Sequence, residues 1–221
     1  MRKLFLVCSC LAAFMLPGMA QDSRLIDYVN PFVGTDGYGN VYPGAQIPFG
    51  GIQISPDTDS KFYDAAAGYK YAHTTLLGFS LTHLSGTGIP DLGDFLFVPG
   101  TGEMKLDPGT HEQPDSGYRS RYSHDREWAS PNYYGVVLED YGVKAEMTSG
   151  LRSGMFRFTY PKSDKAFIMI DMNHTLWQSC EWANLRMIND STLTGYKLVK
   201  GWGPERHVYF VATFSKKLTG L

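Results

Sequence analysis

Apolar and polar residues alternate along much of the second half of the chain. Residues 143–147 (VKAEM) and 155–160 (MFRFTY) each place an apolar side chain at every other position. A period of two with one polar face is typical of half-buried antiparallel strands. Further apolar segments at 166–172, 192–199 and 207–214 follow at short spacing, with turn residues at 161–164 and 201–204. The pattern predicts an antiparallel β-sandwich.

The chain before about residue 100 is rich in turns. Residues 30–60 contain four prolines among several glycines, and prolines at this frequency exclude long helices. We interpret the short apolar runs at 52–54 (IQI) and 96–98 (LFV) as strands between turns. After the first twenty residues we find no apolar stripe of useful length with helical spacing. The sequence therefore predicts an all-β fold with long Gly/Pro-rich loops.

The first twenty residues have a different character. Arg2 and Lys3 precede the apolar stretch LFLVCSCLAAFML, and small residues lead to Ala20. We expect a secretory signal peptide over residues 1–20 that is removed after Ala20, leaving residues 21–221 as the exported domain. The alternative is a lipoprotein signal that uses Cys10, but the apolar run continues for six residues beyond that cysteine. Export places the protein in the periplasm or at the cell surface.

Only one cysteine remains after the signal peptide. Because Cys8 and Cys10 leave with it, Cys180 has no partner for an intramolecular disulfide. It lies in WQSCEW, between two strand-like segments. We expect a small buried apolar residue there, and not a nucleophile.

Charge and composition exclude some classes of partner. The chain has 43% hydrophobic residues, and its 20 basic and 22 acidic residues are well mixed, giving a net charge of -2. No basic stripe is present to neutralise phosphates or anionic lipid, so we expect no nucleic acid partner. Beyond the signal peptide no segment has the length of a transmembrane helix, so we expect no membrane span.

Residues 83–95 (HLSGTGIPDLGDF) form the segment richest in candidate chemistry. A dinucleotide-binding G-x-G-x-x-G motif would need glycine where Asp91 stands, and no helical pattern follows. The chain has no Gly-Lys-Ser/Thr, which excludes a P-loop. Ser85 lies in Leu-Ser-Gly and not in the G-x-S-x-G of a nucleophile elbow.

Metal motifs are also incomplete in this sequence. Residues 57–60 (DTDS) begin like an EF-hand loop, but Phe62 stands where glycine is required and Gly68 where glutamate is required. We interpret that segment as a capped turn. The six histidines show no zinc-ligand spacing.

Carbohydrate binding is the chemistry that remains. Sugars are bound by aromatic faces and by short polar side chains, commonly on loops that a rigid scaffold holds. Both kinds are present here, although glycine turns and aromatic strands also make ordinary β cores. The aromatic candidates are Phe62, Tyr63, Tyr69 and Tyr71, and the polar candidates are His83, Ser85, Thr87, Asp91 and Asp94.

Several unusual motifs in order along the chain resemble the amino-terminal domain of glycoside hydrolase family 92. They are NPFVGT, YPGAQIPFGGIQISPDT, GYKY, GFSLTHLSGTG with the following D-x-G-D, and ASPNYYGVVLEDYGVKAEMT. Members of this family are exo-acting α-mannosidases. The resemblance covers nearly all of residues 21–221.

The resemblance implies a two-domain parent protein. Its amino-terminal domain is a supersandwich-like β-sandwich, and a following (α/α)6 barrel carries the general acid, the general base and the Ca2+ ligands. Hydrolysis proceeds with inversion, which uses two carboxyl groups roughly 6.5–9.5 Å apart. The chain ends before such a barrel, so we expect a domain incomplete at its C-terminus, with no catalytic or metal-binding residue. Its partners are a mannose-containing glycan and the missing catalytic domain.

The resemblance implies that the loops of this domain form part of the wall of the active-site pocket. The expected substrate-binding residues are Phe62, Tyr63, Tyr69, His83, Ser85, Asp91 and Asp94. Asp91 and Asp94 have a structural alternative, in which they bond backbone amides within the glycine loop, and His83 is open between the two roles. Tyr69 and Tyr71 are expected on one strand face, either as core or as a sugar platform. Trp202 with Arg206 is a candidate buttress of the domain interface.

Two segments depart from the family pattern. Gly37-Tyr38-Gly39-Asn40 stands where histidines are associated with the family, and Ala72-His73 stands where an acidic residue is usual. The resemblance therefore does not extend to linkage preference. Two other readings stay open: a non-catalytic carbohydrate-binding or surface-docking module, and a purely structural partner of a catalytic domain. Because an isolated sandwich exposes its apolar interface, we expect low stability or aggregation of this chain alone.

Overall fold

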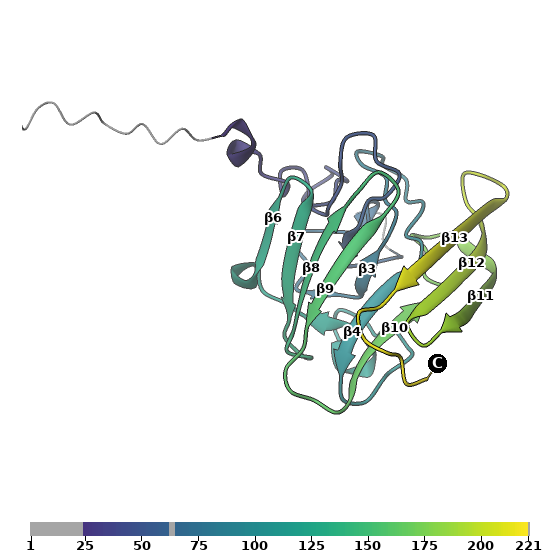
Figure 1. Ribbon diagram of the computed structural model, residues 1–221. Helices are drawn as coiled ribbons and strands as arrows, with labels where there is room; N and C mark the ends of the chain where they lie inside the picture. The colour runs from purple at the N-terminus through teal and green to yellow at the C-terminus, as the bar shows by residue number, and fades with distance from the viewer. Residues whose placement is uncertain (1–23, 62–64, 221) are drawn as a thin grey trace, which may run out of the picture.

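The computed structural model describes residues 24–61 and 65–220, and within them the fold is all-β (Figure 1). Helical structure in these ranges is limited to short 3-10 turns, among them η1 (Leu25–Tyr28), η3 (Pro114–Ser116) and η4 (His124–Arg126). The strands are β1 (Ser55–Asp57), β2 (Thr75–Leu76), β3 (Gly78–Ser80), β4 (Leu96–Thr101), β5 (Ser120–Arg121), β6 (Glu127–Ser130), β7 (Tyr133–Leu138), β8 (Val143–Ser149), β9 (Gly154–Thr159), β10 (Ala166–Asp171), β11 (Ser179–Asn189), β12 (Thr192–Lys200) and β13 (Arg206–Thr213).

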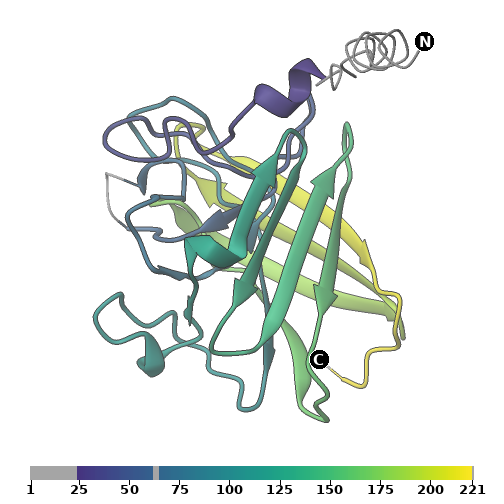
Figure 2. The same cartoon turned by 90° about the vertical axis from the view of Figure 1, so that its left-hand side faces the viewer.

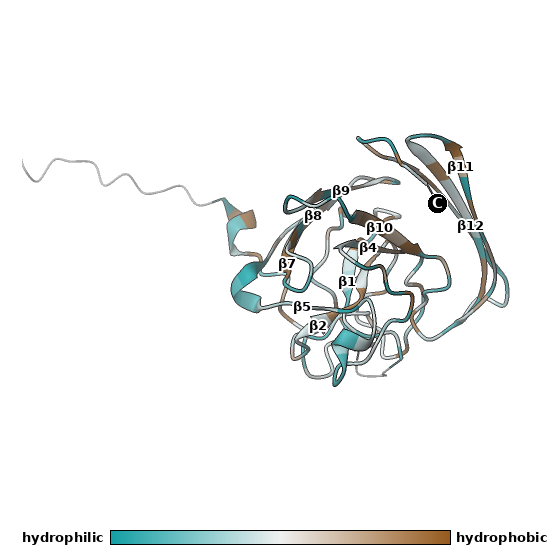
Figure 3. Cartoon of the chain, turned by 90° about the horizontal axis from the view of Figure 1, so that it is seen from below, coloured by the Kyte–Doolittle hydropathy of each residue, from teal (hydrophilic) through white to brown (hydrophobic). Residues whose placement is uncertain are grey.

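These strands form antiparallel sheets. One is the meander β6-β7-β8-β9, a second has the order β1-β3-β4-β10, and a third is the meander β11-β12-β13; β2 and β5 form a small pair. Seen from below, β4 and β10 lie between the β6–β9 sheet and the β11–β13 sheet (Figure 3). The antiparallel β-sandwich is confirmed.

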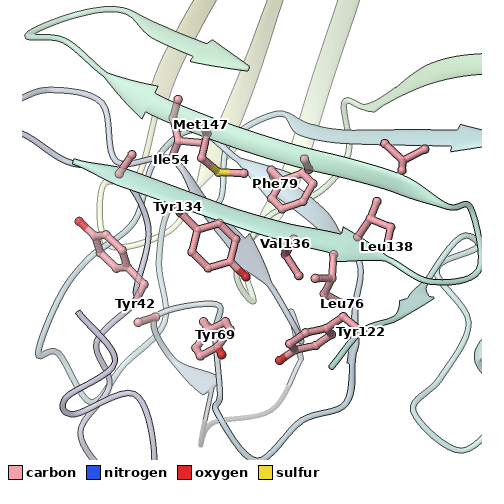
Figure 4. Packing of buried hydrophobic residues seen from close by; sticks show 14 residues of the cluster. Tyr42, Ile54, Tyr69, Leu76, Phe79, Tyr122, Tyr134, Val136, Leu138 and Met147 are labelled. Atoms are coloured by element: carbon pink, nitrogen blue, oxygen red, sulfur yellow. The ribbon is translucent and has the colours of Figure 1, made fainter. Parts of the chain in front are cut away.

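The main core lies between the β6–β9 sheet and the β1-β3-β4-β10 sheet. Alternate residues of β7, namely Tyr134, Val136 and Leu138, point inward beside Phe79 of β3 (Figure 4). Each side chain of this size contributes roughly 1.5–3 kcal/mol when it is fully buried. The period of two that the sequence shows is thus the period that fills this core.

Phe97 of β4 joins this core to the third sheet. Its ring centroid lies 5.2 Å from that of Phe156 on β9 and 5.9 Å from that of Phe210 on β13. The β11–β13 sheet is therefore held to the rest of the sandwich by aromatic packing around one strand.

Most strands predicted from the alternation are confirmed, at 96–98, 143–147, 155–160, 166–172, 192–199 and 207–214. The strand expected at 52–54 is wrong in its position along the chain. The strand β1 begins at Ser55, and Ile54 makes only an isolated bridge with Ala45. Cys180 lies in β11 and is half-buried. Among the described residues no helix is both long enough and apolar enough to span a bilayer.

Candidate functional site

Four loop segments meet at one end of the sandwich, which we call the loop end: residues 34–40, 82–95, 172–178 and 201–206. Hydrogen bonds link them, from Gly86 N to Asn40 O (2.7 Å) and from Leu176 N to Leu92 O (3.0 Å). The segment that precedes β1 and the β12–β13 turn lie in the upper part of Figures 1 and 2. The candidate loop 83–95 is thus the centre of a connected loop layer.

A buried carboxylate lies directly beneath this layer. Asp57 at the end of β1 has Oδ1 2.7 Å from Nε2 of His83 and Oδ2 2.7 Å from Nε2 of His174. Nδ1 of His83 lies 2.6 Å from the carbonyl oxygen of Gln53. Burial by itself raises the pKa of the Asp57 carboxyl, but the two histidines outweigh burial and hold that pKa below its usual range. Asp57 therefore clamps loops 83–95 and 172–178 to β1.

Asp91 and Asp94 fasten the other end of the loop to the β12–β13 hairpin. Asp94 accepts hydrogen bonds from Thr82 Oγ1 (2.7 Å) and from Arg206. It also lies 3.1 Å from the ammonium of Lys197, and both side chains of this pair are fully buried. Burial alone raises the pKa of Asp94, but Lys197 and Arg206 hold it below its usual range.

Asp91 bonds mainly to backbone. Its carboxylate accepts hydrogen bonds from Leu92 N (2.6 Å) and from Trp202 N (2.8 Å). Asp91 thus accepts from one backbone amide within the loop and from a second outside it, whereas the Asp94 carboxylate contacts side chains. A sugar contact of either residue remains a prediction.

The glycines of the loop serve two purposes. Gly93 has a φ of +73°, and a Cβ there would lie 2.8 Å from the backbone nitrogen of Leu176. At this position the loop needs glycine for its close approach to the 172–178 segment. Gly86 and Gly88 have open space around them, and Ser85 beside them is exposed. The tip of the loop is therefore the part that a ligand or another domain can reach.

Tyr69 lies apart from this network, in a buried cluster around Glu127. Its hydroxyl donates to the Glu127 carboxylate at 3.0 and 3.1 Å, and the Tyr134 hydroxyl donates at 2.5 Å. His124 Nδ1 lies 2.5 Å from the same carboxylate. The expectation that Tyr69 and Tyr71 share one strand face is wrong, because neither residue lies in a strand. The Glu127 carboxylate thus joins the side chains of Tyr69, Tyr134 and His124 in one buried cluster.

Tyr71 is the exposed member of the pair. Its ring stacks on His124 at 3.8 Å and 3°, and the residue is 38% exposed. It lines a shallow hollow of about 360 Å³. The other lining residues are Asn30, Phe32, Val33, Gly34, Thr35 and Asp36. The hollow joins aromatic rings to short polar groups, which is the combination that sugars require.

The predicted site residues are thus only partly brought together. His83, Asp91 and Asp94 belong to one buried network, Ser85 lies at its exposed tip, and Tyr69 lies in the separate Glu127 cluster. Phe62 and Tyr63 lie outside the described residues. Sequence reasoning missed Asp57, His174, Lys197 and Glu127 as parts of these networks. One signal could have identified Lys197. In the strand predicted at 192–199, it is a charged residue between Tyr196 and Leu198.

In residues 24–61 and 65–220, no group of three or more His, Cys, Asp or Glu side chains is arranged to hold a metal ion. The pKa values of the Asp57 and Asp94 carboxyls are lowered, whereas a general acid usually has a raised carboxyl pKa.

Comparison with known proteins identifies the family of most of the chain. Residues 28–221 match the family model described as glycosyl hydrolase family 92 N-terminal domain. The family GH92 alpha-mannosidase BT3965 from Bacteroides thetaiotaomicron, solved in complex with mannoimidazole, is 89% identical, with a TM-score of 0.88. That match covers 90% of this chain and 26% of the other. The gh92 family glycosyl hydrolase ccman5 is 28% identical with a TM-score of 0.71, covering 85% of this chain and 26% of the other.

A curated relative is an uncharacterized secreted glycosidase from Arthroderma benhamiae. It is 29% identical over 145 residues, which is 65% of this chain and 18% of that protein. The chain therefore spans about a quarter or less of the length of these relatives.

Proposed function

Because the chain belongs to glycosyl hydrolase family 92, as its N-terminal domain, we propose that it supports the catalytic domain of an exported exo-α-mannosidase. The parent enzyme acts on mannose-containing glycans, depends on Ca2+ and inverts the anomeric centre. This domain packs on the catalytic barrel through its loop end and walls part of the active-site pocket. The 89% identity to a family GH92 alpha-mannosidase supports the substrate class, and the signal-like residues 1–20 support export.

One observation carries the proposed packing. Phe49 is 99% exposed and holds a φ of +59°, a left-handed conformation that is unusual for a bulky residue. Tyr38, 94% exposed, lies in the 34–40 segment of the loop end. Phe49 lies in the loop that leads from the 34–40 segment to β1, beside the four segments of the loop end. Exposed large apolar side chains of this kind are typical of an interaction surface. A second domain that covers this surface explains both the exposure and the strained backbone.

In this division of labour the chain's own residues position and do not catalyse. The Asp57 and Asp94 networks hold loop 83–95 rigid, so that its tip presents Ser85 at a fixed place. Tyr71 and the adjoining hollow offer an aromatic wall for a sugar ring. Protonation of the leaving oxygen and activation of water belong to the carboxyl pair of the catalytic domain.

Phe49→Ser tests the proposed packing in the gene product read to its natural stop codon. We expect mannose release from α-linked mannobiose to fall at least tenfold, because the domain interface loses an apolar anchor that is worth about 2 kcal/mol. Leu106→Ser is the matched control, since Leu106 is also exposed (77%) but lies in a different loop, between β4 and η3. Equal activity of the two variants would contradict packing through the surface that carries Phe49.

A further inference from the structure

Three aromatic side chains from neighbouring strands lie in a row on the β11–β13 sheet. They are Trp182 of β11, Tyr196 of β12 and Tyr209 of β13. The ring centroids of Trp182 and Tyr196 lie 5.0 Å apart, and those of Tyr196 and Tyr209 lie 4.6 Å apart. Tyr196 and Tyr209 are direct partners in the antiparallel register. We call the three residues the aromatic row.

The aromatic row faces away from the sandwich. Successive strand residues point to opposite faces, and the neighbours of Tyr196 on the inner face, such as Lys197 and Val199, are fully buried. Trp182 is 52% exposed and Tyr209 is 69% exposed. Within the described chain these rings therefore contribute little to the core, and their outer faces are open.

Polar groups at the row are oriented by their own partners. The Tyr196 hydroxyl lies 2.7 Å from Nδ1 of His207, and Nε2 of His207 lies 2.8 Å from Glu205. When Nε2–H of His207 donates to the Glu205 carboxylate, Nδ1 of His207 accepts a hydrogen bond from the Tyr196 hydroxyl. The lone pairs of the Tyr196 oxygen then remain available to accept from a ligand hydroxyl. Asn184 stands opposite Tyr196 in the register and adds an amide on the same face.

Two pairs of opposite charges lie near the row, and the exposed Arg186 lies further along the same face of β11. Lys200 lies 3.1 Å from Glu181, and His207 lies 2.8 Å from Glu205. A surface of open rings, a hydroxyl and an amide, with most of its neighbouring charges paired, complements a neutral polyhydroxylated ligand better than a nucleic acid or an acidic polymer. Sugar rings present C–H groups that pack on the negative face of an aromatic ring.

From this arrangement we infer that the outer face of the β11–β13 sheet is a second glycan-binding surface, with the aromatic row as its platform. It lies on the outer face of this sheet and borders the loop end at Glu205, and its ligand is a neutral mannose-containing glycan chain. Only the identity of the sugar rests on the proposed function. The rings are tilted by 53° and 33° to one another, following the twist of the sheet, so the surface suits a flexible chain and not a flat crystalline face.

The consequence is specific to long substrates. A platform away from the catalytic pocket raises the effective concentration of a polymer at the enzyme and has no effect on a disaccharide. We test this with the gene product read to its natural stop codon, carrying Trp182→Thr and Tyr209→Thr together. Threonine keeps the β propensity of the strands while it removes both rings. Leu151→Ala is the control, because Leu151 is also exposed (59%) but lies in the turn between β8 and β9.

In native gels that contain soluble α-mannan, we expect retardation by the mannan to weaken about tenfold in the double variant and to persist in Leu151→Ala. Turnover of α-mannobiose should be unchanged in both, whereas kcat/KM on the polymer should fall in the double variant. Unchanged retardation would overturn the inference, as would equal retardation of the natural protein by an α-glucan. If another part of the protein covers this face, the double variant loses thermal stability and leaves retardation by mannan unaltered, which also overturns it. Failure of the proposed function shows separately, as no mannobiose turnover by the natural protein.

Discussion

Asp94→Asn is expected to lower the free energy of unfolding by about 3–5 kcal/mol, because it removes the carboxylate that neutralises a buried ammonium. Lys197 is fully buried beside Asp94, and its ammonium also donates to the carbonyl oxygen of His174 and lies 5.2 Å from the ring centroid of Phe95. A domain is stable by only about 5–15 kcal/mol, so this loss removes a large share of the stability. The midpoint of urea unfolding measures the effect.

A compensating variant separates the charge from mere packing. Asp94→Leu together with Lys197→Leu removes both charges and refills the space with apolar atoms, which is often neutral or stabilising. We expect this pair to recover most of the midpoint that Asp94→Asn loses. A double variant as unstable as Asp94→Asn would show that the ion pair itself is not the source of the effect.

The chain is also expected to lose stability steeply in acid. The pKa of Asp57 in the folded state lies below its usual range, since His83 and His174 outweigh burial. The unfolded state, with a carboxyl pKa of about 3.9, then binds more protons than the folded state below about pH 4. The contribution of Asp57 to the free energy of unfolding is therefore fully present above that pH. It is lost as the pH falls toward the lower pKa of the folded state.

Asp57→Asn is the variant that isolates this effect. We expect a lower urea midpoint than the natural chain at pH 6 and a shallower decline between about pH 4 and pH 2, because one linked carboxylate is gone. Asp94 contributes a decline of the same sign in both proteins. Parallel midpoint curves for the two proteins would contradict the role given to Asp57.

The strands could be predicted from the sequence because a half-buried sheet imposes a period of two on the chain. β8 and β9 show it plainly, with Ala145 and Met147 inward and Lys144 outward. The position of the strand near Ile54 could not be predicted correctly, because proline and glycine on both sides interrupt the alternation of apolar and polar residues. Residues 69–71 alternate like a strand, yet backbone bonds from Tyr71 N to Thr35 O build a loop.

The site was harder to predict because burial of polar residues is a tertiary property. His83, Asp91 and Asp94 were identified as a polar loop, but nothing local shows that Lys197 and Arg206, about a hundred residues later, neutralise the loop's carboxylates. In the same way, Asp57 meets His174 across 117 residues of chain. Their substrate contacts, and those of Tyr69 and Ser85, stay predictions. The aromatic row was missed because Trp182, Tyr196 and Tyr209 meet only through sheet register.

The account is tested most directly by mannose release from α-linked mannobioses in the presence of Ca2+. The purified 221-residue chain is assayed beside the gene product carried to its natural stop codon. We predict that the longer protein releases mannose and that the 221-residue chain does not. Release by the 221-residue chain would contradict the account, because the general acid and base would then have to lie among these residues.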